Sequence, residues 1–442
     1  MKKDVLFTVV LLASVMAARA GQDVDGWNLK ARQKFAEQRF GIFVHWVIYA
    51  NYGQGEWYLE VGHPDESVYA RMRDGFYPSK FDAREWIRCF RDAGAKYMTF
   101  TSRHHDGFSL WPTAADDGYN MANTPFKRDV LGELEAACRD EGLQFNLYYS
   151  LMDWHRKDYP TGSCKGARKS IPDKREDYAS YKSFMKAQLL ELCERYHPGY
   201  FWLDGEWDHL GRGADGEHLP GGFDWGFDEL YDLIHAHHVL VANNNHMAMR
   251  AKEDIQLFER DLPGENASGF SKGQPVAVDR PIEQCETLTP GYWGFRAVPD
   301  GFRSSEEVVA MLARAAAKNT NLLLNVGPDG SGRLPARAVE VLKGVGEWMR
   351  NNGDSIYGTA AGGVAFGKDV VSTRKGNVLY LHFLNPMVDK VAFALDGEIA
   401  GVRVLDGKGT AKAERTPSGD VVVSVSRENG YGFDVVAVLD VR

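Results

Sequence analysis

Between about residues 26 and 356, short apolar runs alternate with longer amphipathic stretches. Strands that alternate with helices of ten or more residues predict a parallel sheet. A segment of this length favours closure of that sheet into a (β/α)8-like TIM barrel. The expected strands are Gly41–His45, Tyr97–Thr101, Gln144–Ser150, Tyr200–Asp204, Val239–Asn243 and Asn321–Val326, and the expected helices are Phe81–Ala93, Val130–Glu141, Asp177–Tyr196, Gly226–His237 and Ser304–Lys318.

The helical periodicity stops after Ile356-Tyr357-Gly358, and short alternating segments separated by Gly, Asp and Asn take over. This pattern predicts a small C-terminal antiparallel β-sandwich. Packing against the barrel is its simplest role, and sugar binding is the alternative. We therefore expect a barrel over residues 21–356 and a sandwich over residues 357–442. The expected strands of the sandwich are Asn377–Phe383, Lys390–Leu395, Gly401–Leu405, Asp420–Ser426 and Phe433–Leu439.

The first twenty residues have the order of a secretory signal: two lysines, an apolar run from Val5 to Met16, and Ala18-Arg19-Ala20 before Gly21. The run is shorter than the roughly 20 residues of a membrane-spanning helix. No cysteine follows it to carry a lipid anchor. The sequence thus predicts a signal peptide over residues 1–20 and a secreted protein, in the periplasm, without a membrane span.

Charge and cysteine content exclude several classes of function. The 52 Lys and Arg against 61 Asp and Glu give a net charge of −9, and no basic run stands out, which argues against a nucleic-acid binder. Five cysteines without C-x-x-C spacing predict neither a zinc ribbon nor a disulfide framework. We expect an ordinary globular protein without a metal site.

Several expected strands end in polar side chains, as the catalytic end of a barrel requires. Among them are His45, the pair His104-His105 and Tyr148. Two adjacent histidines point opposite ways on an extended chain, so they rarely share one metal. Neutral imidazoles instead suit hydrogen bonds with sugar hydroxyls, while neighbouring aromatic rings stack on a sugar face.

Asp204 follows four apolar or aromatic residues and precedes a glycine. A carboxylate at a strand end in partly desolvated surroundings is a candidate nucleophile or base. The alternative is an aspartate that caps the following turn. Strand alternation makes Glu206 a competitor on the same side, although the intervening glycine weakens that argument.

Eight stretches, in order from about Trp27 to Thr359, are similar to one enzyme family. They read FGIFVHW, EWY, HHDGFSLWP, LYYS, WLDG, WGF, NLLLNVGPDGSG and IYGT. Together they resemble the α-L-fucosidases of glycoside hydrolase family 29. The resemblance implies a (β/α)8-like barrel followed by a β-sandwich, and exo-hydrolysis of terminal α-L-fucose from fucosylated glycans without a metal or organic cofactor.

The resemblance also implies roles for individual residues. A retaining mechanism carries over with Asp204 as the nucleophile and a second carboxyl group as the acid/base. For the acid/base we prefer Glu259, with Glu283 second and Glu286 and Glu265 as weaker alternatives. The implied sugar contacts are His45, Glu56, Trp57, His104, His105 and Tyr148, with Trp293 against the C5 methyl group.

The sequence departs from the family pattern at two points. Val47 stands where a glycine is common, and the strand end Asn243–His246 lacks the usual Asp-Arg, which puts a sugar-contacting arginine in doubt. A general acid needs a raised pKa, which burial near Phe258 favours and Arg260 opposes. We expect Cys285 to be a wall residue of the pocket.

Two other functions remain open at this stage. One is a related exo-glycosidase that acts on a fucose-like sugar such as α-L-galactose. The other is a catalytically silent sugar-binding protein. The presence of both Asp204 and Glu259 argues against the silent binder.

Overall fold

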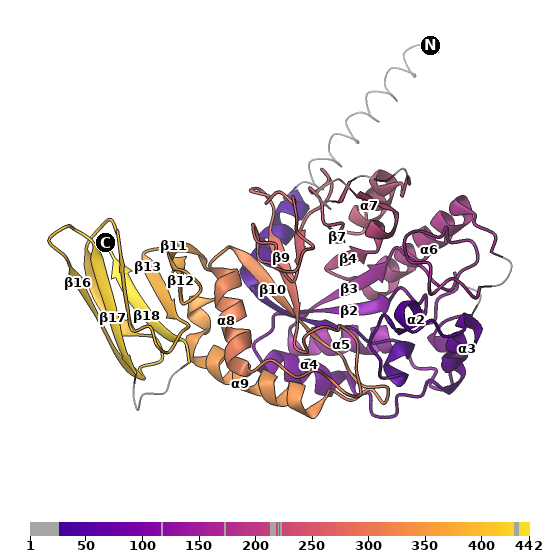
Figure 1. Cartoon of the computed structure of the whole chain (residues 1–442), viewed down its shortest axis with the longest axis horizontal. Coiled ribbons are helices and arrows are strands. Elements are labelled where there is room, and N and C mark those ends of the chain that lie inside the picture. The colour runs from indigo at the N-terminus through magenta and orange to yellow at the C-terminus, as the bar shows by residue number, and fades with distance from the viewer. Residues whose placement is uncertain are drawn as a thin grey trace, which may run out of the picture.

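The computed structural model describes residues 26–115, 118–171, 174–212, 218–219, 221, 223–427 and 433–442. The chain forms a barrel followed by two antiparallel sheets, and the two parts lie end to end (Figure 1). This architecture confirms the predicted fold class. The segment predicted as a signal peptide, residues 1–20, lies outside the described residues.

The barrel is an eight-stranded parallel sheet in the order β7-β4-β3-β2-β1-β10-β9-β8. Its strands are β1 (Phe40–Val44), β2 (Tyr97–Arg103), β3 (Gln144–Ser150), β4 (Tyr200–Asp204), β7 (Leu240–Asn244), β8 (Gln256–Glu259), β9 (Ile282–Thr287) and β10 (Thr320–Val326). A parallel bridge between Ala242 and Ile255 brings the two edge strands together, so the barrel is nearly closed. The two strands missed in the sequence, β8 and β9, read QLFE and IEQCET and lack the continuous apolar run of the others.

Helices cover the outside of the barrel, and four of the six longer ones begin with a side-chain cap. The longer ones are α4 (Ala83–Asp92), α5 (Val130–Glu141), α6 (Tyr178–Tyr196), α7 (Phe227–His235), α8 (Ser305–Ala316) and α9 (Ala336–Asn352). The shorter ones are η1 (Ile48–Asn51), α2 (Tyr58–Val61), α3 (Glu66–Ala70), η2 (Arg71–Gly75), η3 (Met121–Asn123), η4 (Glu206–His209) and η5 (Gly353–Ser355). Asp82, Asp129 and Asp177 accept backbone N–H bonds at the starts of α4, α5 and α6, and Ser304 forms a capping box with Glu307. Loops rather than helices join β7 to β8 and β8 to β9 in the described chain.

The barrel interior is filled by aromatic side chains, including Phe35, Tyr97, Tyr200 and Trp202. These rings pack on one another, with the centroid of Phe35 at 5.3 Å from those of Tyr97 and Tyr200. Because the lower part of the barrel is packed, space for a ligand is left at the carboxyl ends of the strands.

The C-terminal part consists of a five-stranded and a three-stranded antiparallel sheet. The first contains β11 (Ala360–Phe366), β12 (Val370–Lys375), β13 (Val378–Phe383), β18 (Val435–Val441) and β15 (Ile399–Val404), and the second contains β14 (Lys390–Phe393), β17 (Val421–Arg427) and β16 (Gly409–Arg415). One apolar core joins residues of both sheets, such as Leu381 and Val423, which confirms a sandwich. A two-stranded ribbon of β5 (Gly211–Arg212) and β6 (His218–Leu219) belongs to the barrel half.

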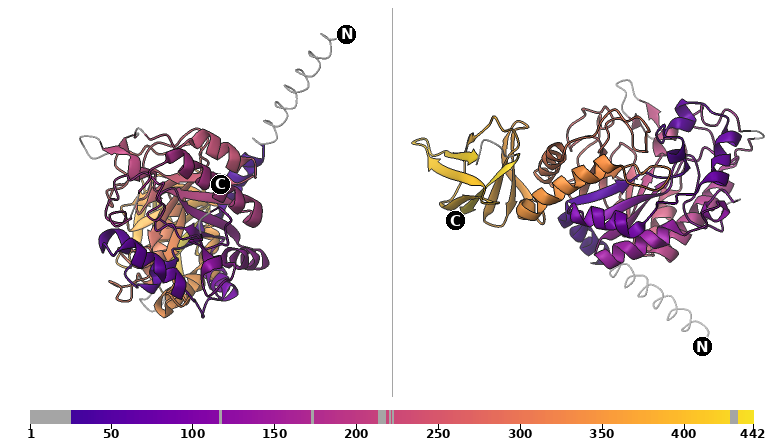
Figure 2. Two further views of the ribbon diagram at one scale, coloured as in Figure 1. Left: turned by 90° about the vertical axis from the view of Figure 1, so that its right-hand side faces the viewer. Right: turned by 90° about the horizontal axis from the view of Figure 1, so that it is seen from below.

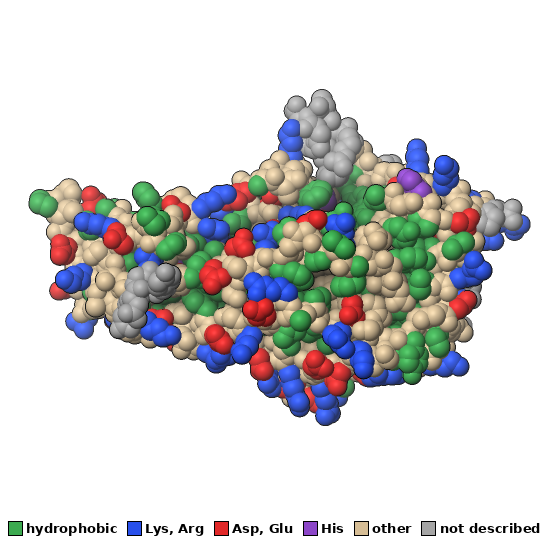
Figure 3. Space-filling view, turned by 60° about the horizontal axis from the view of Figure 1, so that its bottom comes forward, with side chains coloured by type: hydrophobic (Ala, Val, Ile, Leu, Met, Phe, Trp, Pro, Cys, Tyr) green, Lys and Arg blue, Asp and Glu red, His purple; other side chains and the backbone are tan. Residues whose placement is uncertain are grey.

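The sandwich contacts the barrel through α8 and α9, as the view from below shows (Figure 2). Arg314 of α8 donates to the carbonyl of Lys368, and Trp348 of α9 packs on a small cluster with Tyr380 and Val438. On the face drawn in Figure 3, positive and negative side chains are interspersed. Among the described residues, no helix combines the length and the apolar character needed to cross a membrane.

Candidate active site

A cavity of about 550 Å³ opens at the carboxyl ends of the barrel strands. Its lining includes the predicted residues His45, Glu56, Trp57, His104, His105, Tyr148, Asp204, Glu259 and Trp293. The cavity lining also contains residues that were not predicted as site residues: Phe43, Val61, Trp202, Trp207, His246, Arg260, Phe270, Gly291 and Tyr292. The fold therefore brings the predicted nucleophile, the preferred acid/base and all seven predicted sugar contacts into one cavity.

Asp204 is the last residue of β4 and its side chain is held by donors on both oxygens. Tyr148 donates to Oδ2 at 2.8 Å, whereas the backbone N–H of Gly205 and the indole of Trp207 donate to Oδ1 at 2.8 and 3.0 Å. The neighbouring glycine has φ +95°, a conformation that strains other residues, and a Cβ there would meet Met152 at 2.9 Å. This turn fixes Asp204 with its carboxylate facing the cavity.

Glu259 is the last residue of β8, and one amide joins it to Asp204. The Nδ2 atom of Asn244 lies 2.9 Å from Oε2 of Glu259 and 3.3 Å from Oδ1 of Asp204. Those two oxygens are therefore no farther apart than the sum of the two contacts. The amide of Asn244 thus holds the two carboxylates close to each other, as a glycosidase that uses a pair of carboxyl groups requires.

The two carboxyl groups have pKa values shifted in opposite directions. Burial and the charge of Glu259 raise the pKa of Asp204. Burial also pushes the pKa of Glu259 upward, but His246, Asn244 and Arg260 outweigh it and lower that pKa. The expectation of a raised pKa for the acid/base is thus wrong, because the neighbouring side chains supply more hydrogen bonds and positive charge than the sequence suggested.

Three of the four histidines that line the cavity, His45, His104 and His105, are buried and neutral. Burial lowers the pKa of His45 to about 3, and it lowers those of His104 and His105 well below their usual range. His45 Nδ1 lies 2.7 Å from the side-chain oxygen of Asn325, and His105 Nδ1 lies 2.8 Å from the hydroxyl of Ser150. The bond of His45 leaves its Nε2 atom for a ligand, whereas Nε2 of His105 lies 3.5 Å from Oδ2 of Asp204.

His104 and His105 both line the cavity, with ring centroids 4.1 Å apart. The expectation that they point opposite ways is wrong, because β2 ends at Arg103 and the pair lies in the turn that follows. Within the described part of the chain, no cluster of three or more His, Cys, Asp and Glu residues is placed to hold a metal ion.

The wall next to His45 is built from two loops tied together by Glu56. Its Oε2 atom accepts the backbone N–H groups of Trp293 and Gly294 at 3.0 and 2.7 Å. The amide of Asn325 donates to the carbonyl of Trp293 at 2.7 Å. The Trp293 ring is thereby held with its centre 5.2 Å from that of the His45 ring.

Arg260 lines the cavity, which was not predicted from the sequence. The guanidinium of Arg260, directly after Glu259, lies 5.1 Å from the centre of the Trp293 ring. The strand end Asn243–His246 lacks an arginine, and Arg260 brings a positive charge to the cavity lining. Val47 causes no strain, because it is buried with φ −147°, an extended conformation open to any residue.

The alternative carboxylates do not line this cavity. Glu283 lies deeper in the barrel, where Tyr97 and Tyr200 donate to it at 2.7 and 3.1 Å and burial raises its pKa to about 8. Glu206 pairs with Arg250 outside the cavity. Glu286 pairs with Arg303, and Glu265 pairs with Lys318.

The expectation that Cys285 forms part of the pocket wall is also wrong. Its side chain belongs to the packed barrel interior and is 1% exposed. Its backbone carbonyl accepts the N–H of Arg260 at 2.9 Å, so it holds the end of β8 from the neighbouring strand β9.

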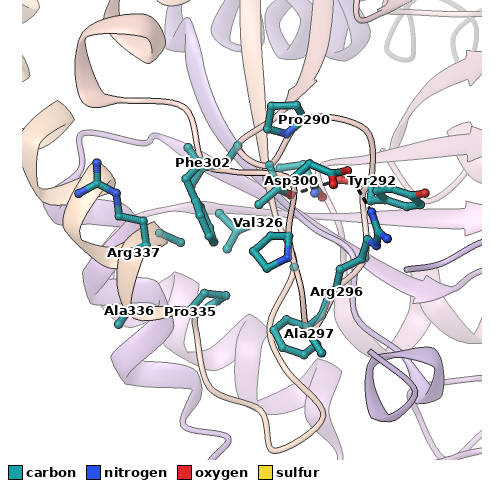
Figure 4. A pocket seen from close by; sticks show the side chains of 18 residues that line it. Pro290, Tyr292, Arg296, Ala297, Asp300, Phe302, Val326, Pro335, Ala336 and Arg337 are labelled. Carbon is teal, nitrogen blue, oxygen red and sulfur yellow. Dashed lines mark hydrogen bonds and ion pairs between the residues drawn. The ribbon is translucent and has the colours of Figure 1, made fainter. Parts of the chain in front are cut away.

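The loop that carries Trp293 also lines a second cavity of about 260 Å³ (Figure 4). Its walls are mainly apolar and include Pro290, Phe302, Val326 and Pro335. Asp300 is the single carboxylate among the described residues that line it, and it pairs with Arg296 at 3.0 Å. Without a second carboxylate, this cavity lacks the pair found beside Asn244.

Comparisons with known proteins agree with this geometry. The family model described as Alpha-L-fucosidase matches residues 15–354. The tissue alpha-L-fucosidase of Homo sapiens is 28% identical over 382 residues, which cover 79% of this chain and 75% of the relative. Among solved structures, alpha-L-fucosidase isoenzyme 1 from Paenibacillus thiaminolyticus has a TM-score of 0.80 and 30% identity, over 94% of this chain and 100% of that one.

A second solved structure, an alpha-L-fucosidase of family 29 from Bacteroides thetaiotaomicron, was trapped as a covalent intermediate with 2-fluoro-fucosyl fluoride in a Glu-to-Gln mutant. It has a TM-score of 0.79 and 25% identity, over 93% of this chain and 96% of that one. The family match spans most of the chain, and the carboxylate pair lies where the barrel fold places catalytic groups. This protein therefore belongs to the α-L-fucosidase family and is a glycoside hydrolase.

Proposed function

We propose that this protein is a retaining exo-α-L-fucosidase in which Asp204 is the nucleophile and Glu259 is the general acid/base. The observation that carries the proposal is the amide of Asn244, which bonds both carboxylates across the floor of the cavity. The covalent intermediate of the Bacteroides thetaiotaomicron enzyme supports it by analogy.

In the first step, an oxygen of Asp204 attacks the anomeric carbon and the glycosidic C–O bond breaks. The leaving oxygen takes the proton of Glu259, and a fucosyl ester of Asp204 results. In the second step, water attacks the same carbon, Glu259 accepts the proton of the water, and Asp204 leaves as a carboxylate. Substrate binding that excludes water from Glu259 favours the protonated acid that the first step needs.

Hydroxyl recognition falls to the neutral histidines and to Glu56. A neutral imidazole both donates and accepts hydrogen bonds, which matches a ring hydroxyl. Trp293 offers an apolar face to the C5 methyl group. Because a single methyl discriminates by only about 1 to 3 kcal/mol, the polar contacts carry most of the sugar selectivity.

Release of p-nitrophenol from the α-L-fucoside and from the α-L-galactoside tests the proposed sugar. We expect turnover of the fucoside with the higher kcat/KM. Turnover of the galactoside alone would identify the related glycosidase, and ligand protection against unfolding without turnover of either would identify a silent binder.

We also propose that residues 1–20 are removed during secretion to the periplasm, in line with the charged, apolar and small-residue order of that segment. N-terminal sequencing of the mature protein tests this: a chain that begins at Gly21 supports the proposal, and a retained Met1 contradicts it.

A further inference from the structure

Phe270 lies at the mouth of the catalytic cavity, next to the proposed acid/base. Its side chain lines the cavity and is 38% exposed. The Phe270 ring stacks on the imidazole of His246, with centroids 5.4 Å apart and planes inclined by 24°. The Nε2 atom of His246 lies 3.2 Å from Oε2 of Glu259. The imidazole of His246 therefore connects the Phe270 ring to the carboxyl group of Glu259.

The loop that presents Phe270 is anchored to the backbone around Glu259. The hydroxyl of Ser268 donates to the buried carboxylate of Asp261 and lies 3.3 Å from the carbonyl oxygen of Glu259. The N–H of Ser268 donates to Asp261 at 2.9 Å, and the N–H of Phe270 donates to the Ser268 hydroxyl at 3.1 Å. Any shift of Phe270 relative to Glu259 would break several of these bonds.

The tripeptide Asn266-Ala267-Ser268 takes part in the same network. The side-chain oxygen of Asn266 accepts the N–H of Ser271 at 3.0 Å, and Ser268 forms the anchor described above. Both polar side chains thus act within the loop that holds Phe270.

The position of the acid defines the side of the cavity that receives the leaving group. A general acid must lie within hydrogen-bond reach of the oxygen that it protonates, so the aglycone begins beside Glu259. A group attached to that oxygen extends from Glu259 toward the mouth. Two of the side chains there, Val61 and Phe270, are apolar and exposed, at 72% and 38%.

We propose that Phe270 is the platform on which the aglycone of the substrate stacks. It is a specificity-determining residue for uncharged aglycones that present a flat apolar face, either an aryl group or the C–H face of a second sugar ring. This inference rests on the proposed function of Asp204 and Glu259 and extends it beyond the fucose ring.

The test compares two substrates that share the fucose and differ in the aglycone: p-nitrophenyl α-L-fucoside and methyl α-L-fucoside. Loss of an aromatic contact worth about 0.5 to 1.5 kcal/mol corresponds to roughly a two- to tenfold change. Phe270→Ala should lower kcat/KM for the aryl substrate by that factor and change kcat/KM for the methyl substrate less than about twofold. Phe270→Trp should retain the aryl preference, and the inhibition constant of free fucose should stay unchanged.

Phe366→Ala is the matched control, because Phe366 is 57% exposed on β11 in the sandwich. It should leave both substrates unaffected. An equal loss on both substrates, or no loss on either, would overturn the role of Phe270 while leaving the fucosidase proposal intact. If the wild-type protein releases fucose from neither substrate, the proposed function fails first and the role of Phe270 fails with it.

Discussion

Replacing Tyr148 by Phe removes one hydrogen bond to Asp204 and keeps the packing of the aromatic ring at residue 148. The Tyr148 ring is fully buried and stacks on His104 at 5.4 Å and on Trp202 at 5.5 Å, contacts that a phenylalanine retains. The hydroxyl donates to Oδ2 of Asp204 at 2.8 Å and so favours the carboxylate form.

A hydrogen bond to a charged group is worth about 1.5 to 3 kcal/mol, which corresponds to roughly one to two pKa units. Burial already raises the pKa of Asp204, and Tyr148→Phe should raise it further. Because the nucleophile acts as a carboxylate, the acid limb of kcat/KM should move to higher pH by about one to two units. At a pH below the acid limbs of both proteins, kcat/KM of Tyr148→Phe should be about 10- to 100-fold lower than that of the wild type, whereas the plateau near neutral pH should change less.

The assay is kcat/KM for p-nitrophenyl α-L-fucoside as a function of pH. Tyr149→Phe is the matched control, since Tyr149 is equally buried but donates to Gln188 at 2.9 Å instead of to Asp204. It should leave the pH profile unchanged. An unshifted acid limb in Tyr148→Phe, or an equal shift in both variants, would refute the reasoning.

Three further predictions concern other ionisable groups of the barrel. Glu259→Ala should lower kcat/KM by about 10²- to 10⁴-fold for substrates with poor leaving groups and much less for substrates with activated ones. Added azide should restore activity to this variant. If azide instead restored activity to a Glu283 variant, the assignment of the acid/base would be reversed. The pKa of Glu283 is raised to about 8 from 4.5, so its contribution to stability is lost as pH rises from about 4.5 to 8. Glu283→Gln, which cannot ionise, should flatten that decline in the free energy of unfolding measured in urea, and an unchanged slope would contradict it. Burial lowers the pKa of His45 to about 3, so NMR should show a neutral ring with a single N–H proton above about pH 4, and titration near pH 6.5 would exclude this environment.

The sequence predicts most of the barrel because six of its strands are continuous apolar runs, as buried parallel strands require. Strands β3 and β4 have the predicted bounds, and Asp204 emerges at a strand end as expected. The strands β8 and β9 were missed because their inward-facing side chains include carboxylates, which interrupt the apolar pattern.

Because β8 and β9 were not predicted, sequence context could not distinguish Glu259 from Glu283 as the acid/base. The β8–β9 register pairs Glu259 with Cys285 and Leu257 with Glu283. Glu283 therefore lies two residues deeper, which is about 7 Å along a strand. A difference in depth of this kind depends on pairing between strands, which no local pattern encodes.

The contribution of Arg260 was hidden for a related reason. A charged residue beside a candidate acid is visible in the sequence, but its direction is set by the backbone at the end of β8. Arg260 has φ +60°, a left-handed conformation uncommon for residues other than glycine. In this conformation of the backbone, its guanidinium lies beside the Trp293 ring.

The central claim is that Asp204 bonds covalently to the sugar, and labelling tests it most directly. The protein is treated with 2-fluoro-fucosyl fluoride, digested and mapped by peptide mass spectrometry. The account predicts one fluorofucosyl label on the peptide that contains Asp204, and its loss in Asp204→Ala. A label on another residue, or no label in a protein that turns over α-L-fucosides, would contradict it.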